Sequence, residues 1–416
     1  MSPPFLNNAL RAADFGSPFY LPKFIFTPGF LSTLPANLTR LKFLKSVLLV
    51  FVLVIAGPKA QAQKSFIDKF KFWKQDTAVK SEGIFLFPLL YYTPDTRIAA
   101  GAVGIYYFNT GSHTTLKDSK TRLSYVKLLS DYTQNKQFDL WSSWNVFTNE
   151  EKYLLKGELR YRRFPDRFYG VGNNTPESNE EFYTYDLFHI KLLGMRKVAD
   201  KFFVGLDYQF SYEYNFGLED GGILQRGDIV GYNGGTGSGA GAVITYDSRD
   251  NVVNAYEGSL FEVSAYYFDD NLGGNFSYFN LNAVFSTYKE VFKHHVVGVH
   301  LLSRTNFGGV PFLDMAKAGG DEILRGYAAN RYRDHHFAGM QVEYRFPVWW
   351  RFGAVVFAGA GDVMRSPVDL SLNRLKYSFG GGFRFNINKR ERLNLRFDYG
   401  FGRKSNAFYI MMGEAF

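Results

Sequence analysis

Three kinds of residue in the sequence could do chemistry, and the first is a run of glycines. Residues 234–241 (GGTGSGAG) have the composition of a loop that binds phosphate through its backbone N–H groups. Such a loop follows a hydrophobic strand and opens a helix. Here no hydrophobic strand precedes the glycines, and an alternating, strand-like pattern follows them. We therefore expect a flexible outer loop rather than a phosphate site.

The second kind is a pair of adjacent histidines, which occurs twice. His294 and His295 are neighbours, and so are His335 and His336. Histidines that share a zinc ion are usually several residues apart, and adjacent ones lack that spacing. We expect all four histidines at strand ends or in loops, and we expect neither a metal nor a cofactor.

The third kind is a cluster of acids and a base, formed by Asp247, Arg249 and Asp250. It falls in a predicted turn, where such side chains hydrogen-bond to the backbone. No nucleophile elbow, zinc-binding helix or Ser/His/Asp arrangement has the context that its chemistry requires. The chain has no cysteine, which excludes disulfides and thiolate metal sites. We therefore do not expect an enzyme.

Any site would be positioned by strands. From about residue 83 onward, apolar and polar residues alternate with a period of two, which is typical of β-strands. Within the segment 391–402, one face is apolar and comprises Leu393, Leu395, Phe397, Tyr399 and Phe401. The opposite face is polar or small and comprises Asn394, Arg396, Asp398 and Gly400. A soluble barrel fills its interior with hydrophobic side chains. Charged inner faces beside apolar outer faces therefore indicate lipid outside and water inside.

Counting such segments gives about sixteen strands, each long enough to cross a bilayer at a tilt. They lie near residues 84–92, 95–108, 120–132, 135–147, 151–164, 182–196, 200–215, 237–247, 258–269, 274–288, 294–306, 336–346, 351–360, 374–387, 391–402 and 407–416. An even strand number places both ends on the periplasmic side, with short turns there and long loops outside. The sequence thus predicts an all-β fold, a transmembrane antiparallel β-barrel.

The residues before the barrel read as an export signal. Residues 40–62 combine a basic start, an apolar core of about a dozen residues and a small-x-small cleavage site. Residues 1–39 stay unassigned, as a mis-assigned start codon would explain, and 63–82 form a periplasmic linker or a short interfacial helix. The net charge of +9 is scattered rather than gathered in one stripe, so we expect no nucleic-acid partner.

The stretch 319–347 resembles the BamA/TamA-type outer-membrane assembly proteins, also called the bacterial surface antigen family. Its core, Leu324-Arg325-Gly326-Tyr327, is similar to the family's V-R-G-F signature, which lies in a long outer loop folded back into the lumen. The strand count puts this loop between the eleventh and twelfth strands, where the family carries it. Further similarities lie at 169–174 (YGVGNN), 246–251 (YDSRDN) and 413–416 (GEAF).

The chain departs from the family in two ways. The family places soluble repeat domains before the barrel, whereas only 63–82 intervene here, too few for a domain. We therefore expect the barrel domain alone, at 83–416. The family's F-x-D-x-G strand, whose acid meets the loop arginine, appears as Phe357-Ala358-Gly359-Ala360-Gly361, without its aspartate. Asp362 has the wrong strand parity to replace it.

Two sets of site residues follow from the resemblance. The loop arginine, Arg325, needs a carboxylate partner, and Glu343 is the nearest candidate because it shares the inward parity of Gln341 and Arg345. An exposed position for Arg325 in water is the alternative. The last strand should carry an assembly signal at its periplasmic end, formed by Phe408, Ile410, Met412 and Phe416.

The resemblance implies a function in helping proteins or lipids to insert into the outer membrane or cross it. The implied partners are outer-membrane lipids, and client proteins or partner lipoproteins. A passive or loop-plugged channel for small solutes is the alternative, because a polar lumen allows it. An outer-membrane enzyme is the third class, and the missing catalytic constellation speaks against it.

Overall fold

The computed structural model describes residues 82–93, 97–110, 124–134, 136–148, 150–389 and 392–416. The predicted N-terminal extension, signal peptide and linker lie outside the described residues, except that Glu82 begins the first strand. Within these ranges, no helix is long and apolar enough to cross a membrane.

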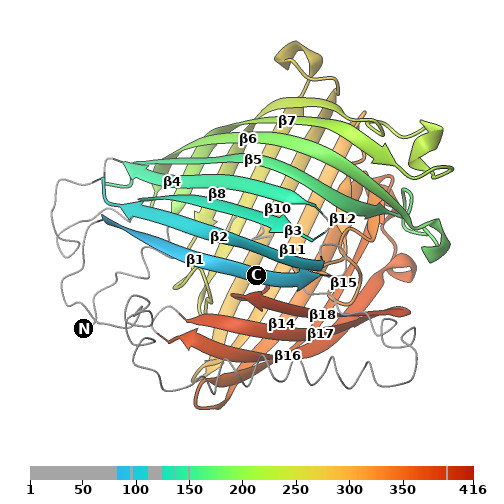
Figure 1. Ribbon diagram of the computed structural model, residues 1–416. Helices are drawn as coiled ribbons and strands as arrows, with labels where there is room; N and C mark the ends of the chain where they lie inside the picture. Colours follow the sequence, from blue (N-terminus) through green and yellow to red (C-terminus); the bar gives the residue numbers. More distant parts are fainter. Residues whose placement is uncertain (1–81, 94–96, 111–123, 135, 149, 390–391) are drawn as a thin grey trace, which may run out of the picture. The chain divides into compact units, whose positions relative to one another are not determined.

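One antiparallel sheet of sixteen strands holds the described residues together, with its strands paired in chain order (Figure 1). The strands are β1 (Glu82–Thr93), β2 (Arg97–Phe108), β3 (Ser124–Thr133), β4 (Phe138–Thr148), β5 (Tyr153–Phe168), β6 (Glu181–Ala199), β7 (Phe202–Leu218), β8 (Gly235–Asp247), β9 (Gly258–Phe268), β10 (Tyr278–Phe292), β11 (His295–Gly308), β14 (His336–Trp349), β15 (Phe352–Met364), β16 (Lys376–Asn388), β17 (Leu393–Gly402) and β18 (Ser405–Met412). A separate hairpin pairs β12 (Ala316–Ala318) with β13 (Tyr332–Asp334).

The strands form where the sequence alternates, and the two faces separate as the alternation predicts. On β16, the side chains of Phe379 and Phe383 are 61% and 68% exposed. Arg384, the next residue on the same strand, points to the opposite face and is buried. On β17, Asn394, Arg396 and Asp398 are all buried. We call the face that carries these polar residues the inner face and the opposite one the outer face. All sixteen predicted strands occur, with boundaries that differ by a few residues.

The connections differ between the two ends of the sheet. Most turns at one end are short, and we call it the short-turn end. Three of its turns contain only two residues outside the strands, and each has one residue in the left-handed region: Lys201, His294 and Trp350. The other end carries the long connections 169–180, 219–234, 309–335 and 365–375. Because sixteen is even, β1 begins and β18 ends at the short-turn end.

We predicted a closed barrel, and the described residues form a curved sheet whose first and last strands are not paired with each other. Phe416, which follows β18, stacks on His300 of β11 with 4.9 Å between the ring centroids, so strands far apart in the sheet order face the same interior. Among the described residues, β1 pairs only with β2, and β18 pairs only with β17. Within the part of the chain that the structure describes, no hydrogen-bonded ladder joins these two end strands.

The glycine-rich stretch 234–241 is not the flexible loop that we expected. All of it after Gly234 belongs to β8, which begins at Gly235. A Cβ atom on Gly239 would lie 2.6 Å from the ring of Phe268, and one on Gly241 would lie 2.4 Å from the carbonyl oxygen of Ala265. The glycines therefore let the ring of Phe268 and the backbone of the neighbouring strand β9 approach closely, and the stretch lies in a strand rather than in a phosphate-binding loop.

The end of the chain also differs from expectation. We predicted a last strand that reaches Phe416, whereas β18 ends at Met412. Gly413 has a φ of +87°, which favours glycine, and its N–H donates to the carbonyl of Asn394. The backbone leaves the ladder at this glycine, and Glu414 and Phe416 contact the inner face instead.

Candidate functional site: a buried ring of charges on the inner face

The connection 309–335, here called the returning loop, lies against the inner face of the sheet. Phe312 is fully buried in an aromatic cluster with Phe168 and Tyr183, at 5.7 and 5.3 Å between ring centroids. Further along the loop, Leu324 and Tyr327 are buried in a second apolar cluster. These two apolar anchors hold the segment between them in place. All four residues of the motif Leu324 to Tyr327 are buried.

Two glycines allow the loop to approach the sheet closely. Gly326 has a φ of +115°, and a Cβ atom there would lie 2.6 Å from the carbonyl carbon of Phe401. A Cβ atom on Gly400 of β17 would lie 2.6 Å from the backbone of Arg325. The N–H of Gly326 donates to the hydroxyl of Tyr409 on β18, at 2.9 Å. The loop backbone therefore rests directly on β17 and β18.

Arg325 is fully buried, and each nitrogen of its guanidinium has an acceptor on the inner face. Its Nε donates to Gln341 at 3.3 Å, one terminal nitrogen donates to Asp398 at 2.6 Å, and the other donates to Glu343. Its Cζ lies 3.5 Å from the ring centroid of Phe357. This fork suits carboxylates, and the ring face favours the cation further.

The ion pairs continue beyond Arg325 and close into a ring. Arg345 contacts Glu343 at 2.8 Å and Glu414 at 3.9 Å. Arg384 contacts Glu414 at 2.7 Å and also pairs with Asp398, which returns to Arg325. We call these six residues the charge ring, in the order Arg325, Glu343, Arg345, Glu414, Arg384, Asp398.

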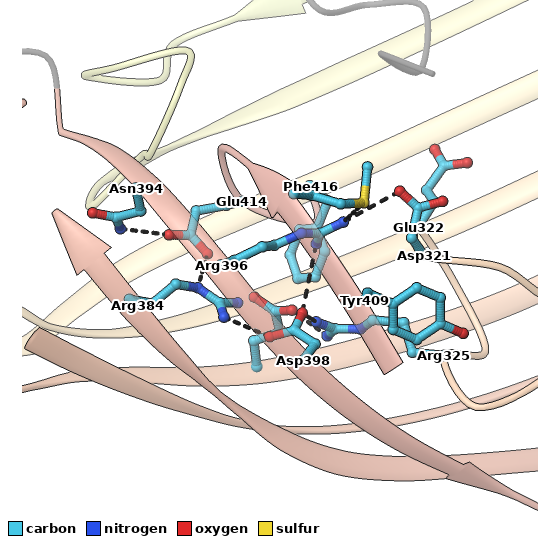
Figure 2. A network of polar contacts seen from close by, with 12 residues as sticks. Asp321, Glu322, Arg325, Arg384, Asn394, Arg396, Asp398, Tyr409, Glu414 and Phe416 are labelled. Atoms are coloured by element: carbon cyan, nitrogen blue, oxygen red, sulfur yellow. Dashed lines mark hydrogen bonds and ion pairs between the residues drawn. The ribbon is translucent and has the colours of Figure 1, made fainter. Parts of the chain in front are cut away.

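Positive and negative side chains alternate around the charge ring, so its formal charge is zero. Every side chain in it is at most 7% exposed. Figure 2 shows one side of the ring, where Arg325, Asp398, Arg384 and Glu414 lie in sequence. Burial makes unpaired charges costly, and each charge here has neighbours of opposite sign on both sides.

The other long loops support the returning loop at the end opposite the short turns. Gly172 donates its N–H to the carbonyl of Arg333, at 2.8 Å. Arg331 donates to Thr175 and lies 4.2 Å from the ring centroid of Tyr169. Burial, and then Glu180, raise the pKa of Tyr169 to about 12. The stretch 169–174 thus packs against the returning loop rather than forming a site of its own.

A family model described as the Omp85 superfamily domain matches residues 206–416. The chain belongs to the Omp85 superfamily. BamA from Haemophilus ducreyi, in a crystal structure that lacks POTRA domains 1–3, has a TM-score of 0.56 and 13% identity, with 84% of this chain and 77% of that chain covered. CdiB from Escherichia coli has a TM-score of 0.52 and 8% identity, with 79% and 62% covered.

CdiB from Acinetobacter baumannii also matches, with a TM-score of 0.48, 12% identity and 79% and 59% of the two chains covered. This Omp85 chain therefore spans less than two thirds of the length of either CdiB chain. No curated protein matches it in sequence. At such identities the likeness to the solved structures concerns the fold.

Arg325 contacts Glu343, the partner that we predicted from strand parity. It also contacts a second acid, Asp398, which we did not predict as a partner. Asp398 stands on β17, two strands beyond the Omp85 strand whose aspartate is replaced by Gly359. Its inward parity beside Arg396 was visible in the sequence. Asp362 does not contact Arg325; its carboxylate accepts a hydrogen bond from Asn173 and lies 3.8 Å from Arg374.

The residues expected to form an assembly signal separate onto two faces. Phe408 and Ile410 alternate with the buried, inward-facing Tyr409 and Met411, so they have outer-face parity. Met412 ends β18. Phe416 lies on the inner side, against His300. Phe416 thereby comes near the charge ring, where its ring lies 5.2 Å from the guanidinium of Arg345.

The other candidates from the sequence take structural positions. Asp247 pairs with Arg249, and Asp250 accepts backbone N–H groups from Tyr256 and Glu257, as expected of a turn. His295 and His336 begin strands. Among the residues that the structure describes, no group of three or more His, Asp or Glu side chains could hold a metal ion. The arrangement is suited to holding segments together by ion pairing rather than to acid–base chemistry.

Proposed function

We propose that this Omp85 chain is an integral outer-membrane barrel that assists the insertion or passage of proteins or lipids. The observation that carries the proposal is the pair of edge strands, β1 and β18, which have one hydrogen-bonded neighbour each among the described residues. A strand at the end of a sheet can exchange its backbone N–H and C=O groups with a strand from another chain and so template it. The work then needs hydrogen bonding and a disturbed bilayer, and no catalytic group.

The outer face supports a lipid environment. Large apolar side chains on different strands are exposed there, including Leu206 at 75%, Phe383 at 68%, Phe379 at 61% and Val356 at 52%. Such a band on a soluble protein would be an aggregation hazard, whereas lipid solvates it. Trp349 and Trp350, at 71% and 64% exposed in a short turn, are suited to the membrane–water interface.

The same proposal sets the orientation and the export route. Short turns belong on the periplasmic side of outer-membrane barrels and long loops on the outside. The short-turn end, with the start of β1 and the end of β18, is therefore periplasmic. Residues 40–62 would direct export and be cleaved, which leaves 63–81 as a linker or interfacial helix before β1. Client proteins or partner lipoproteins would approach from this side.

A passive solute channel is the second candidate, and the polar inner face of β4 and β5 favours it. There Asp139 pairs with Arg160 across the strands, as in the wall of a water-filled pore. The returning loop and the charge ring occupy the interior near β14 to β18, which opposes free passage. Ion conductance of the purified protein in planar bilayers separates the two candidates: steady conductance at low voltage supports the channel.

Depletion of the protein in its native bacterium tests the leading proposal. We expect a loss of integral barrel proteins from the outer membrane, together with protease-sensitive precursors in the periplasm. Complementation with the intact chain should restore the barrels. An unchanged outer-membrane proteome, combined with reduced uptake of a small solute, would instead favour the channel.

A further inference from the structure

The segment Gly413–Phe416, here called the tail, is held on the inner face by side-chain contacts at two points. The first point is the carboxylate of Glu414. It accepts a hydrogen bond from the amide nitrogen of Asn394 at 2.7 Å and one from Nε of Arg384 at 2.7 Å. The Glu414 side chain is only 2% exposed.

The second point is the ring of Phe416. It stacks on His300 at 4.9 Å and on Tyr288 at 6.0 Å between ring centroids. The guanidinium of Arg345 lies 5.2 Å from the same ring and donates to the main-chain oxygen of Phe416 at 3.1 Å. Gly298 leaves room for the aromatic ring, because a Cβ atom there would lie 3.2 Å from it.

The two contact points belong to different strands of the sheet. Arg384 and Asn394 belong to β16 and β17, whereas His300 and Arg345 belong to β11 and β14. The tail thus bridges the same two groups of strands that Arg325 bridges through Asp398 and Glu343. In the charge ring, Glu414 stands directly opposite Arg325, and Arg345 and Arg384 separate them on either side.

The ring makes each of the two segments depend on the other. Each of Arg345 and Arg384 contacts Glu414 and one of the two carboxylates that hold Arg325. Arg396, also buried, contacts Asp398 at 3.7 Å and Asp321 at 3.2 Å. Without Glu414, four buried guanidinium groups would therefore share three carboxylates, and the excess positive charge would repel Arg325. Buried charges are costly when they lose a partner, so loss of the tail should loosen the returning loop.

We propose that the tail is a latch and that Glu414 is a positioning residue for Arg325, so that the tail and the returning loop leave the interior together. Arg345 and Arg384 transmit the coupling, because each contacts both halves of the ring. The inference does not depend on the proposed function, since the coupling can be measured on the purified protein without any client.

A double-mutant cycle between opposite sides of the ring tests this coupling. The variants are Arg325→Ala, Glu414→Gln and the double variant, and the readout is the unfolding midpoint in detergent. Coupled residues give non-additive shifts, so the double variant should lose clearly less than the sum of the single losses. The control pairs Arg325→Ala with Asp139→Asn, whose partner Arg160 lies outside the ring. Additive shifts in both cycles would overturn the proposal.

Trypsin cleavage in the returning loop gives a readout that a purely local role for Glu414 would not change. Arg331 and Arg333 are 8% and 1% exposed, so cleavage after them requires the loop to open. We expect Glu414→Gln to speed this cleavage on the order of tenfold or more, because one lost buried partner shifts the opening equilibrium by that much. Glu414→Asp, which keeps the charge, should restore most of the protection. Unchanged cleavage in Glu414→Gln would overturn the latch.

A charge-neutral pair of variants keeps the test valid if Glu414→Gln does not fold. Arg384→Gln alone leaves the ring with one excess negative charge, and adding Glu414→Gln returns it to neutrality. The double variant should therefore resist trypsin better than Arg384→Gln alone. If the second substitution makes cleavage faster instead, charge balance does not hold the loop, and the proposal fails.

Discussion

At the scale of single residues, the site depends on a guanidinium that has an acceptor for each nitrogen. Arg325 donates to Gln341, Glu343 and Asp398, and its face lies on Phe357. A lysine at this position would present three donors from one point and could not reproduce the planar fork. The identity of the side chain therefore matters here as well as its charge.

The pair of Arg325 and Glu343 should behave as a buried ion pair. Arg325→Ala and Glu343→Ala should each cost about 3–5 kcal/mol of unfolding free energy, because each leaves an uncompensated charge. The double variant should be non-additive by about 1–3 kcal/mol, measured by urea unfolding of the detergent-solubilised protein. Arg325→Lys serves as the control that keeps the charge and loses the fork. Strict additivity would show that the two side chains do not act together.

The sequence predicted Glu343 from strand parity, and it could not single out Asp398. Parity tells which face a side chain occupies, and Asp398 was correctly placed on the inner face. The curvature of the sheet decides which inner-face residues of distant strands meet, and no local pattern encodes that curvature. Glu414 was missed for a related reason, since the expected strand continued through Gly413 and gave its side chain no interior neighbours.

At the scale of elements, the small hairpin of β12 and β13 attaches the returning loop to the long-loop end. Lys317 of β12 is partly buried, and desolvation, together with the nearby Arg333, lowers its pKa from 10.5 to about 8. Asp166, Asp314 and Glu213 act in the opposite direction. The hairpin therefore carries a cation that its surroundings disfavour at neutral pH.

Lys317 should make the stability of the protein depend on alkaline pH. Between pH of about 8 and 10.5, the unfolded chain binds the lysine proton and the folded chain has lost it, so stability rises with pH in this window. Lys317→Met removes the titrating group and should abolish that rise. The measurement is the unfolding midpoint of both proteins at pH 7 and pH 10. Identical pH profiles would contradict the assigned role of Lys317.

The tail is the second element with a measurable consequence. Phe416→Ala removes the ring that stacks on His300 and Tyr288 while it leaves the charge ring intact. Loss of a buried aromatic side chain costs about 3–5 kcal/mol, and less here because the ring is only partly buried. We expect less membrane-inserted, heat-modifiable protein on gels, which would also agree with a role of Phe416 in the assembly signal. Phe408→Ala, on the outer face, separates the two effects, because it leaves the interior contacts untouched.

The alternation of apolar and polar residues predicted the strands well. Along each strand, successive side chains point in turn to the lipid and to the interior, and this rule is local. The predicted strand 237–247 covers most of the glycine-rich start of β8, so only the loop that we also expected over 234–241 was wrong. Gly237, Gly239 and Gly241 have no side chains to alternate, and the reason for them lies on neighbouring strands, in Ser211 and Phe268 among others. The local pattern thus located the strand, and it could not give the reason for its glycines, which lies in packing between strands.

At the scale of the whole molecule, an apolar outer face lies opposite an inner face on which the six residues of the charge ring are paired with one another. The returning loop, the charge ring and the tail fill the interior near β14 to β18, and the strand edges β1 and β18 lack a common ladder among the described residues. This arrangement favours work at the edges of the sheet over transport through its centre.

Reconstitution tests this account most directly. Liposomes that contain the purified protein should fold an urea-unfolded outer-membrane barrel protein faster than empty liposomes, measured by the heat-modifiable gel shift over time. Liposomes with an unrelated outer-membrane barrel of similar size control for the general disturbance of the bilayer. The account predicts faster folding with this protein than with either control. Equal folding rates in all three preparations, together with steady ion conductance of the reconstituted protein, would contradict it and support a solute channel.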